Sequence, residues 1–205
     1  MTIRLHRGDL PDLSRYQTGA VAIDTETMGL DPRRDRLCVV QLSPGDGSAD
    51  VVQLPPQAPS APNLIKLLAD ANVLKIFHFA RFDLGVLFEA FGVMPAPVYC
   101  TKIVSRLART YTDKHGLKDL VREILGIDVS KQQQLSDWGA ATLSDAQVAY
   151  AASDVLHLHA LKAKLDAMLA REGREELAAA CLRFLPDRVR LDRAGWALED
   201  IFAHS

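Results

Sequence analysis

The sequence is poor in cysteine, in aromatic residues and in net charge. Its 205 residues include three cysteines, 6% aromatic residues and a formal net charge of −2. Cys38, Cys100 and Cys181 lie far apart with no C-x-x-C spacing, which predicts reduced and mostly packed thiols. The weak net charge argues against a basic, whole-surface grip on duplex nucleic acid. Any nucleic-acid substrate would have to be held locally, by metal ions or by a small basic patch.

Long apolar segments are also absent. No run approaches the ~20 apolar residues of a membrane span, and the starting segment MTIRLHRGDLPDL lacks the apolar core of a signal peptide. We therefore expect a cytoplasmic protein that contacts no membrane. Because 48% of the residues are hydrophobic, the chain can bury a sizeable core. We expect one domain over residues 1–205, with a helical extension from about residue 172.

The first half of the chain alternates strand and helix patterns. Short β-rich runs predict strands at residues 20–25, 36–43, 49–54, 73–77 and 97–100. The PGDG segment before the third strand predicts a hairpin turn. Apolar residues at helical spacing predict helices over 63–71 and 82–91.

The second half reads almost entirely as helix. The pattern predicts helices over 101–110, 117–125, 144–171, 174–184 and 188–202. A polar loop at 128–137 separates the second of these from the third. Together the two halves predict the α/β class, with a mixed sheet flanked by helices and a helical C-terminal half.

An acid pair follows the first predicted strand. Asp24 and Glu26 are two residues apart at the end of an apolar run, so in a strand they point to one face, about 7 Å apart. Two carboxylates placed in this way can hold a hard divalent cation. Taken alone, the pair is better explained as a solvated strand end that leads into the turn at Gly29.

Two further acidic positions follow in order. Asp83 comes after the strand at 73–77, where it can be a metal ligand, an acid in the first turn of the next helix, or both. Tyr150 and Asp154 are four residues apart on a predicted helix and share a face, as residues on an ordinary helix surface also do. Small alanines around this pair would let the helix pack tightly and present Asp154 inward.

The order of these residues makes the joint pattern much rarer than its parts. A strand-borne D-x-E, an Asp between strand and helix, and a helical Tyr-x-x-x-Asp can together build a site for two divalent cations. Mg²⁺ and Mn²⁺ both suit carboxylate ligands. Such ions, about 4 Å apart, activate water and stabilise the leaving oxygen in phosphodiester hydrolysis. The pattern therefore predicts a metal-dependent nuclease.

At these positions the chain resembles the DEDD exonucleases, and more narrowly their ribonuclease D-like branch, which implies a ribonuclease H-like fold. The resemblance implies that Asp24 bridges two metals, that Glu26 and Asp154 complete the first site, and that Asp83 binds the second metal through water. It also implies that Tyr150 orients the attacking water. An alanine precedes Tyr150 where the sister branch has histidine, so the chain resembles the tyrosine type of 3′-5′ exonuclease.

The resemblance extends over essentially the whole chain. KQQQLSDW at 131–138 is similar to the K-x-x-Q-x-S-D-W loop of ribonuclease D-like proteins. DRLCVVQLS, KIFHFARFDL, RTYTDKHGLKDL, YAASDVLHLH and DIFAHS resemble the nanoRNase C family of small bacterial oligoribonucleases. That family implies hydrolysis of dinucleotides and short oligoribonucleotides to 5′-mononucleotides, and assembly into an octameric ring. The chain ends at Ser205, with no room for the extra helical domains of longer ribonuclease D proteins, which also favours short substrates.

Two other functions stay open. A ribonuclease D-like enzyme that trims structured RNA, or an exonuclease that attacks DNA ends, would share this site and differ in substrate. An inactive nucleic-acid-binding module is the alternative from another class, and the intact set of four acids and a tyrosine argues against it. The residues distinguish neither RNA from DNA nor Mg²⁺ from Mn²⁺.

Several polar side chains are candidates for capping a terminal phosphate of the substrate. They are His78, Arg81, Lys102, Lys114, His115, Lys131 and Gln134. His78 is better explained as a packed or hydrogen-bonded histidine than as a metal ligand. An arginine cluster at 33–36 is better explained as a solvated turn, with steering of the substrate's phosphates as the functional alternative. Trp138 is expected to be a structural anchor, with base stacking as the alternative.

The last predicted helix carries an apolar stripe that bears on assembly. At 100° per residue the stripe consists of Leu191, Ala194, Leu198, Ile201 and Phe202. Trp196 lies on the opposite side, so one face can pack on the domain and the other on a neighbouring subunit. A helix break at Gly195 would remove this pattern. The expected homo-oligomer therefore rests chiefly on the family resemblance.

Overall fold

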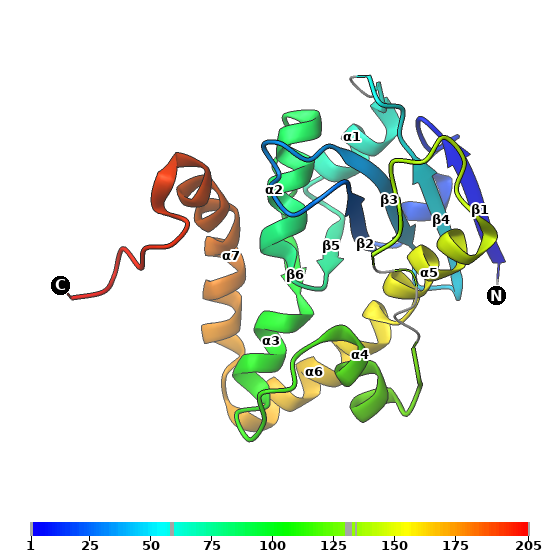
Figure 1. The fold of residues 1–205 in the computed structure, drawn as a ribbon. Coiled ribbons are helices and arrows are strands. Elements are labelled where there is room, and N and C mark those ends of the chain that lie inside the picture. The colour runs from blue at the N-terminus through cyan, green and yellow to red at the C-terminus, as the bar shows by residue number, and fades with distance from the viewer. Residues whose placement is uncertain (1, 58–59, 130–132, 134, 205) are drawn as a thin grey trace.

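A mixed β-sheet forms the centre of the computed structural model, which describes residues 2–57, 60–129, 133 and 135–204. Its strands are β1 (Thr2–Arg7), β2 (Ala20–Thr27), β3 (Leu37–Ser43), β4 (Ser48–Gln53), β5 (Leu74–Phe77) and β6 (Val98–Cys100). They lie in the order β1-β4-β3-β2-β5-β6 (Figure 1). The β2–β3 and β3–β4 pairs are antiparallel, and the β1–β4, β2–β5 and β5–β6 pairs are parallel. Strand β2 is therefore well inside the sheet, with a neighbour on each side.

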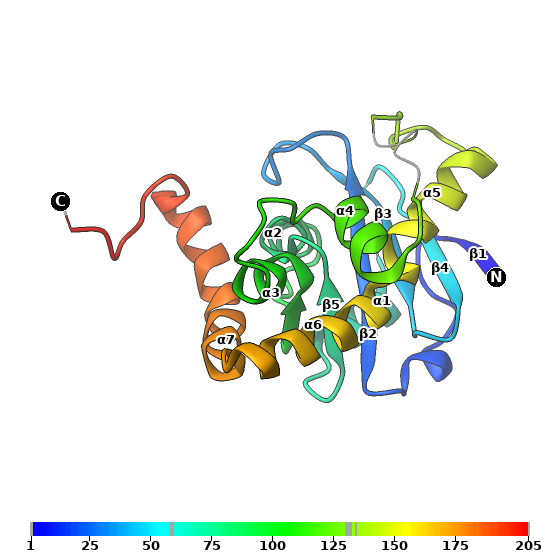
Figure 2. The same ribbon diagram turned by 90° about the horizontal axis from the view of Figure 1, so that it is seen from below.

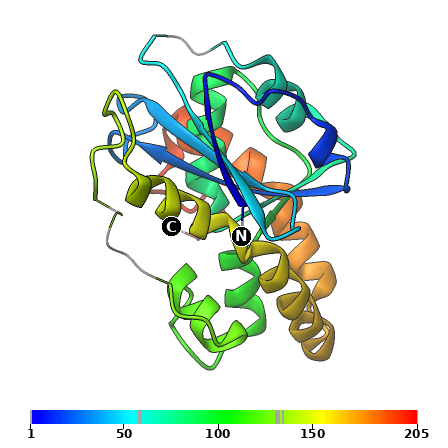
Figure 3. The ribbon, with the colours of Figure 1, turned by 90° about the vertical axis from the view of Figure 1, so that its right-hand side faces the viewer.

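Helices cover both faces of this sheet. They are α1 (Pro62–Ala69), α2 (Ala80–Phe91), α3 (Thr101–Ala108), α4 (Leu117–Leu120), α5 (Asp145–Leu156), α6 (Leu158–Glu172) and α7 (Glu175–Leu191). Shorter helical turns are η1 (Ser14–Tyr16), η2 (Val121–Leu125) and η3 (Asp192–Trp196). Figure 3 shows α5 crossing one face of the sheet while α1 and α2 lie on the other.

Side-chain alternation along the strands divides the core in two. Val21 and Ile23 of β2 point into a cluster that includes residues of α1, α2 and α7. Ala22, between them, points into a second cluster with residues of α5 and α6. The parity of a β2 residue thus decides which set of helices its side chain meets, and this rule also places the polar residues at the end of the strand.

The predicted strands and the first two helices are confirmed, with ends that differ by up to two residues. Strand β1 was not predicted, although Ile3 and Leu5 alternate with polar residues in TIRLHR. The single helix expected over 144–171 is wrong, because the chain turns at His157 between α5 and α6. Helix α5 packs on the strands, whereas α6 packs chiefly on α3. Because the turn contains neither Gly nor Pro, the helical spacing of apolar residues continues through it and predicted one helix instead of two.

The bounds of the last two predicted helices were also wrong. Helix α7 runs without a break through Pro186, so the gap expected at 185–187 does not exist. The helical turn that follows, η3, is interrupted at Gly195, whose φ of 113° is outside the helical range. The apolar stripe is therefore interrupted, and Leu198 and Phe202 are exposed. Figures 1 and 2 show this C-terminal segment leading away from the sheet.

Two expectations about the chain as a whole can be compared with the structure. No helix within the described ranges is long and apolar enough to cross a membrane. Cys38, Cys100 and Cys181 are free thiols, and the first two are buried, as expected for packed cysteines.

The start of α5 is fixed by the side chain of Gln147. Its backbone N–H donates to Ser144 Oγ (3.2 Å), and its Oε1 accepts from the Ser144 N–H (2.9 Å), which is a capping box. Its Nε2 donates to the Asp137 carbonyl oxygen (3.0 Å) and to Ser136 Oγ (3.3 Å). One side chain therefore ties the 136–138 loop to the helix that carries Tyr150 and Asp154.

Replacing this side chain tests the tie. Gln147→Ala is expected to lower the free energy of unfolding by about 1–2 kcal/mol, because a cap and two loop contacts are lost. Urea denaturation would measure the change. Ser144→Ala is the matched variant, since it removes the Oγ acceptor of the Gln147 N–H and leaves both loop contacts of Gln147 in place, and its loss should be smaller. Wild-type stability in Gln147→Ala would contradict this account.

Candidate active site

Three carboxylates converge at the end of strand β2. Ligand oxygens of Asp24, Glu26 and Asp154 all lie within 4.8 Å of one another. Asp24 and Glu26 have the parity of Ala22 and so face the helices of the second core cluster. Asp154 comes to them from α5, which packs on that face. Gln41 of the neighbouring strand β3 donates from Nε2 to Asp24 Oδ2 at 2.8 Å and so fixes the rotamer of that acid.

Asp83 approaches the same strand from the other face of the sheet. It lies in the first turn of α2, is 3% exposed, and its Oδ1 accepts from Thr25 Oγ1 at 2.7 Å. Thr25 lies between Asp24 and Glu26 and points oppositely, toward α2. The structure therefore brings all four predicted acids to one strand end, but Asp83 is not part of the group of three.

Burial and mutual repulsion raise the pKa values of these acids. Burial raises the pKa of Asp24 well above its usual range, and the charges of Asp83, Asp154 and Glu26 add to this rise. Burial, with Asp154 and Asp83 nearby, raises the pKa of Glu26 to about 8. The pKa values of Asp83 and Asp154 rise to about 7, again through burial. The site therefore resists holding four negative charges without a compensating cation.

A cavity of about 310 Å³ opens over the three acids. Besides them, it is lined by His78, Phe79, Lys102, Gly116, Leu117, Lys118, Val129 and Tyr150. Burial and the nearby carboxylates of Asp154, Glu26 and Asp24 raise the pKa of Tyr150, so its hydroxyl keeps its proton. Trp138 is 4% exposed, and its ring centroid lies 6.1 Å from that of Tyr150. Trp138 is thus a packing anchor for the tyrosine, as expected.

Two of the predicted substrate-binding residues line this cavity. His78 Nδ1 lies 2.9 Å from Thr101 Oγ1, and burial lowers the pKa of His78 to about 3, so the ring is neutral. Lys102 Nζ lies 4.2 Å from the centre of the Phe79 ring. Lys102 therefore brings positive charge to the rim of the cavity, whereas His78 can only offer hydrogen bonds.

Other predicted substrate-binding residues lie elsewhere. Arg81 forms a bidentate ion pair with Asp192, in which Nε and Nη2 donate to the two carboxylate oxygens at 2.5 and 2.7 Å. Arg81 does not line the cavity over the acids. His115 Nδ1 lies 2.9 Å from Ser105 Oγ. Lys114 contributes its backbone carbonyl to buried Arg109. Lys131 and Gln134 fall outside the described residues.

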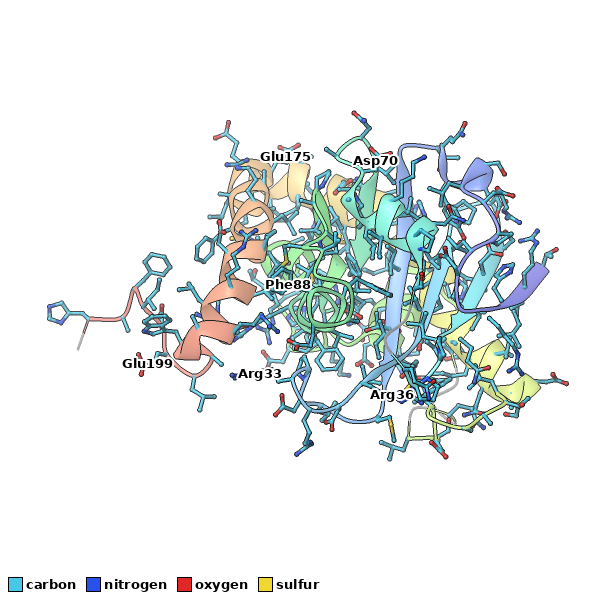
Figure 4. The ribbon with its side chains drawn as sticks, turned by 90° about the horizontal axis from the view of Figure 1, so that it is seen from above. Arg33, Arg36, Asp70, Phe88, Glu175 and Glu199 are labelled. Carbon is cyan, nitrogen blue, oxygen red and sulfur yellow. The ribbon has the colours of Figure 1, made fainter. Side chains whose placement is uncertain are left out.

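The arginine cluster at 33–36 does not act as one patch. Arg34 pairs with its neighbour Asp35, and Arg36 donates to the Gly139 carbonyl oxygen at 3.3 Å. Figure 4 shows Arg33 and Arg36 apart, with Arg33 on the side of α7. Arg34 and Arg36 are thus engaged within the fold, which fits the solvated turn better than a patch that steers phosphates.

Several residues of the site were not predicted from the sequence. Gln41 and Thr25 position acids from adjacent strands, and the D-T-E spacing with strand alternation was enough to find Thr25. Lys118 lines the cavity from α4, in the GLKDL segment that follows the predicted phosphate-binding residues. Phe79 carried no recognisable signal, because an aromatic residue before a helix is ordinary.

Comparison with known proteins gives this site a family. A family model described as 3′-5′ exonuclease matches residues 12–170. Brucella melitensis NrnC with bound Mg²⁺ is 62% identical with a TM-score of 0.96, and the match covers 100% of both chains. NrnC of the same organism bound to pGG is 63% identical, with a TM-score of 0.97 and the same coverage.

More distant relatives are ribonuclease D proteins. Escherichia coli RNase D, described as an exoribonuclease involved in structured RNA processing, is 26% identical with a TM-score of 0.76, over 86% of this chain and 46% of that one. Ribonuclease D of Gluconacetobacter diazotrophicus is 40% identical over 82% of this chain and 42% of its own length. The chain thus spans less than half of these relatives. The matches confirm the predicted fold class and the resemblance to nanoRNase C and ribonuclease D.

The raised pKa values predict how stability depends on pH without metal. Between pH 4 and 8 the folded acids hold protons that the unfolded chain has released, so the free energy of unfolding falls as pH rises through that window. Asp24→Asn removes one repelling charge. In EDTA at pH 8 it should raise Tm by about 2–4 °C for each kcal/mol of repulsion relieved, with little gain near pH 4.

Thermal denaturation from pH 4 to 8 would measure this effect. Asp187→Asn, at an exposed carboxylate of α7, is the matched control and should give no pH-dependent gain. Adding Mg²⁺ should stabilise wild type more than Asp24→Asn. A variant that is less stable than wild type in EDTA at pH 8 would contradict the repulsion account.

Proposed function

The chain belongs to the 3′-5′ exonuclease family, a family of hydrolases, and on that premise we propose that it degrades short oligoribonucleotides to 5′-mononucleotides. Dinucleotides are the proposed main substrates, and two divalent cations the proposed cofactors. The observation that carries the proposal is the convergence of Asp24, Glu26 and Asp154 within 4.8 Å, beside buried Asp83, under one small cavity.

The donor set fits a hard divalent cation. Three carboxylates with oxygens this close offer the all-oxygen ligands that Mg²⁺ and Mn²⁺ prefer. Asp24, Glu26 and Asp154 would hold one ion, and Asp24 with Asp83 a second. When bound, such ions lower the pKa of water and offset the charge of the phosphodiester. The repulsion among the acids supports this assignment, since a bound cation would relieve it.

The remaining residues act on the water and on the substrate. Tyr150, protonated and held against Trp138, is proposed to orient the attacking water beside Asp154. Lys102 and Lys118 bring positive charge to a cavity otherwise dominated by acids, which favours a phosphate there. His78 is neutral and would serve as a hydrogen-bonding partner.

The short substrate is supported by a relative that matches the whole chain. NrnC of Brucella melitensis was solved bound to the dinucleotide pGG, and a cavity of about 310 Å³ suits a small ligand. Trimming of structured RNA, suggested by the ribonuclease D relatives, is the alternative with the same chemistry. Substrate length separates the two.

Activity on RNAs of two, seven and twenty nucleotides, 5′-labelled and with Mg²⁺ or Mn²⁺, tests this proposal. Wild type should clear the dinucleotide fastest, release 5′-mononucleotides and stop in EDTA. Asp154→Ala should be inactive, and Tyr150→Phe should lower kcat by about 10²- to 10⁴-fold. Tyr99→Phe is the matched control, because its buried hydroxyl bonds Asp166 (2.8 Å) and does not line the cavity.

Each other outcome has a defined meaning. Trimming of the 20-mer with the dinucleotide left intact would replace the proposal with RNA processing. Equal activity on DNA of the same lengths would broaden the substrate class. Full turnover in EDTA would contradict the metal-dependent mechanism.

Self-association is also proposed, with an octameric ring as the specific form implied by the family resemblance. The C-terminal segment supports it, because Leu198, Ile201 and Phe202 are apolar and exposed on a part that leads away from the sheet (Figure 2). Sedimentation velocity of wild type should give a species larger than a monomer. Phe202→Asp should shift the distribution toward smaller species, and Leu177→Asp, at an exposed site at the start of α7, should not. A monomeric wild type would refute this part.

A further inference from the structure

A second cavity adjoins the one over the acids. Its volume is about 240 Å³, and its walls come from the loop after β2, the start of α2 and the end of α7. The walls are mostly apolar, and they include Pro32, Arg33, Phe79, Phe82 and Val189. None of the roles assigned above uses this cavity.

Phe79 connects the two cavities. Among the residues that the structure describes, it is the one side chain that lines both. Phe79 is 48% exposed, and Lys102 Nζ lies over its ring, 4.2 Å from the ring centre. An aromatic ring, with a cation beside it, therefore stands between the acids and an apolar recess.

The backbone of Phe79 is strained. Its φ of 66° and ψ of 40° are left-handed, and Phe79 is the one non-glycine residue with positive φ in the described ranges. A bulky side chain is disfavoured there, and Gly or Asn adopts this conformation with less strain. Exposure of a large ring also gives up burial. Neither feature helps the fold, and retained strain of this kind is a mark of functional sites.

We propose that Phe79 is a stacking wall for one nucleobase of the substrate, and that the second cavity receives this base. The inference rests on the proposed function, because the scissile phosphodiester must lie over the acids for the neighbouring base to reach Phe79. Stacking requires an aromatic side chain that a base can reach, and Phe79 is about half exposed and lines both cavities. Arg33 adds a guanidinium at the wall, on the α7 side of its loop (Figure 4), which can stack on the base or donate to its edge.

Base-deletion kinetics test this assignment. The probes are pGG and two analogues, each with one guanine replaced by an abasic sugar, with kcat/KM measured for each. In wild type, deletion of one particular base should lower kcat/KM by roughly 5- to 100-fold, the usual range for a base–aromatic stack. In Phe79→Asn the ratio of kcat/KM for pGG to kcat/KM for that abasic analogue should fall to within about twofold of one. The change should come mainly from a higher KM for pGG. Phe79→Tyr should retain the wild-type ratio.

The choice of asparagine separates stacking from folding. Because Asn tolerates the left-handed backbone, Phe79→Asn should denature at the wild-type temperature or above it. Leu177→Asn is the matched control, since it replaces an exposed apolar side chain of α7 outside both cavities, and should keep the wild-type base dependence. A purely structural role for Phe79 predicts lower stability with the base ratio unchanged.

The failure of this inference is distinguishable from that of the proposed function. A wild type that leaves pGG intact defeats the proposed function itself. A wild type that cleaves pGG but shows no base dependence, or a Phe79→Asn variant that keeps the full dependence, overturns the stacking wall alone.

Discussion

The concentration of buried negative charge at the end of β2 is the constraint on which the rest of the structure depends. Four carboxylates in partial or full burial repel one another and resist ionisation. They can be clustered in this way only if neutral groups hydrogen-bond to them and a cation offsets their charge. Gln41 and Thr25 supply the neutral contacts to Asp24 and Asp83. This repulsion lowers the stability of the metal-free fold at neutral pH. A bound cation would relieve the repulsion, and that relief contributes to the affinity of the site for the cation.

The sheet solves the problem of bringing acids together without placing them side by side in sequence. Alternation along β2 sends Asp24 and Glu26 to the face covered by α5 and sends Thr25 to the face covered by α2. Acids from both helices then reach one strand end from opposite sides. A one-residue slip of β2 would exchange these partners, which makes the antiparallel register with β3, where Asp24 pairs with Gln41, part of the site.

Much of this could be read from the sequence, and the remainder has physical causes. Alternation, short apolar runs and helical spacing located most elements, because buried positions recur with the period of each element. Strands β3 and β4, which are buried along their whole length, were located as continuous β-rich runs. The turn at His157 and the continuity of α7 through Pro186 were not predicted, because tertiary packing rather than local sequence determines them. The four acids were found by spacing and order. The sequence could not predict the contacts of Arg81 and His115. Each pairs in the fold with a residue that no sequence motif links to it, Arg81 with Asp192 and His115 with Ser105.

Arg81 and Phe79 together show how position overrides residue type at the site. A guanidinium near a nuclease centre suggests phosphate binding, yet Arg81 is committed to Asp192 and ties the first turn of α2 to the end of α7. A phenylalanine suggests core, yet Phe79 is half exposed between two cavities. The ion pair anchors α7 beside the second cavity, so the charged residue builds the wall and the apolar residue faces the ligand. At this edge of the sheet, the side chains available to a ligand are therefore those that the fold leaves exposed and unpaired, whatever their residue type.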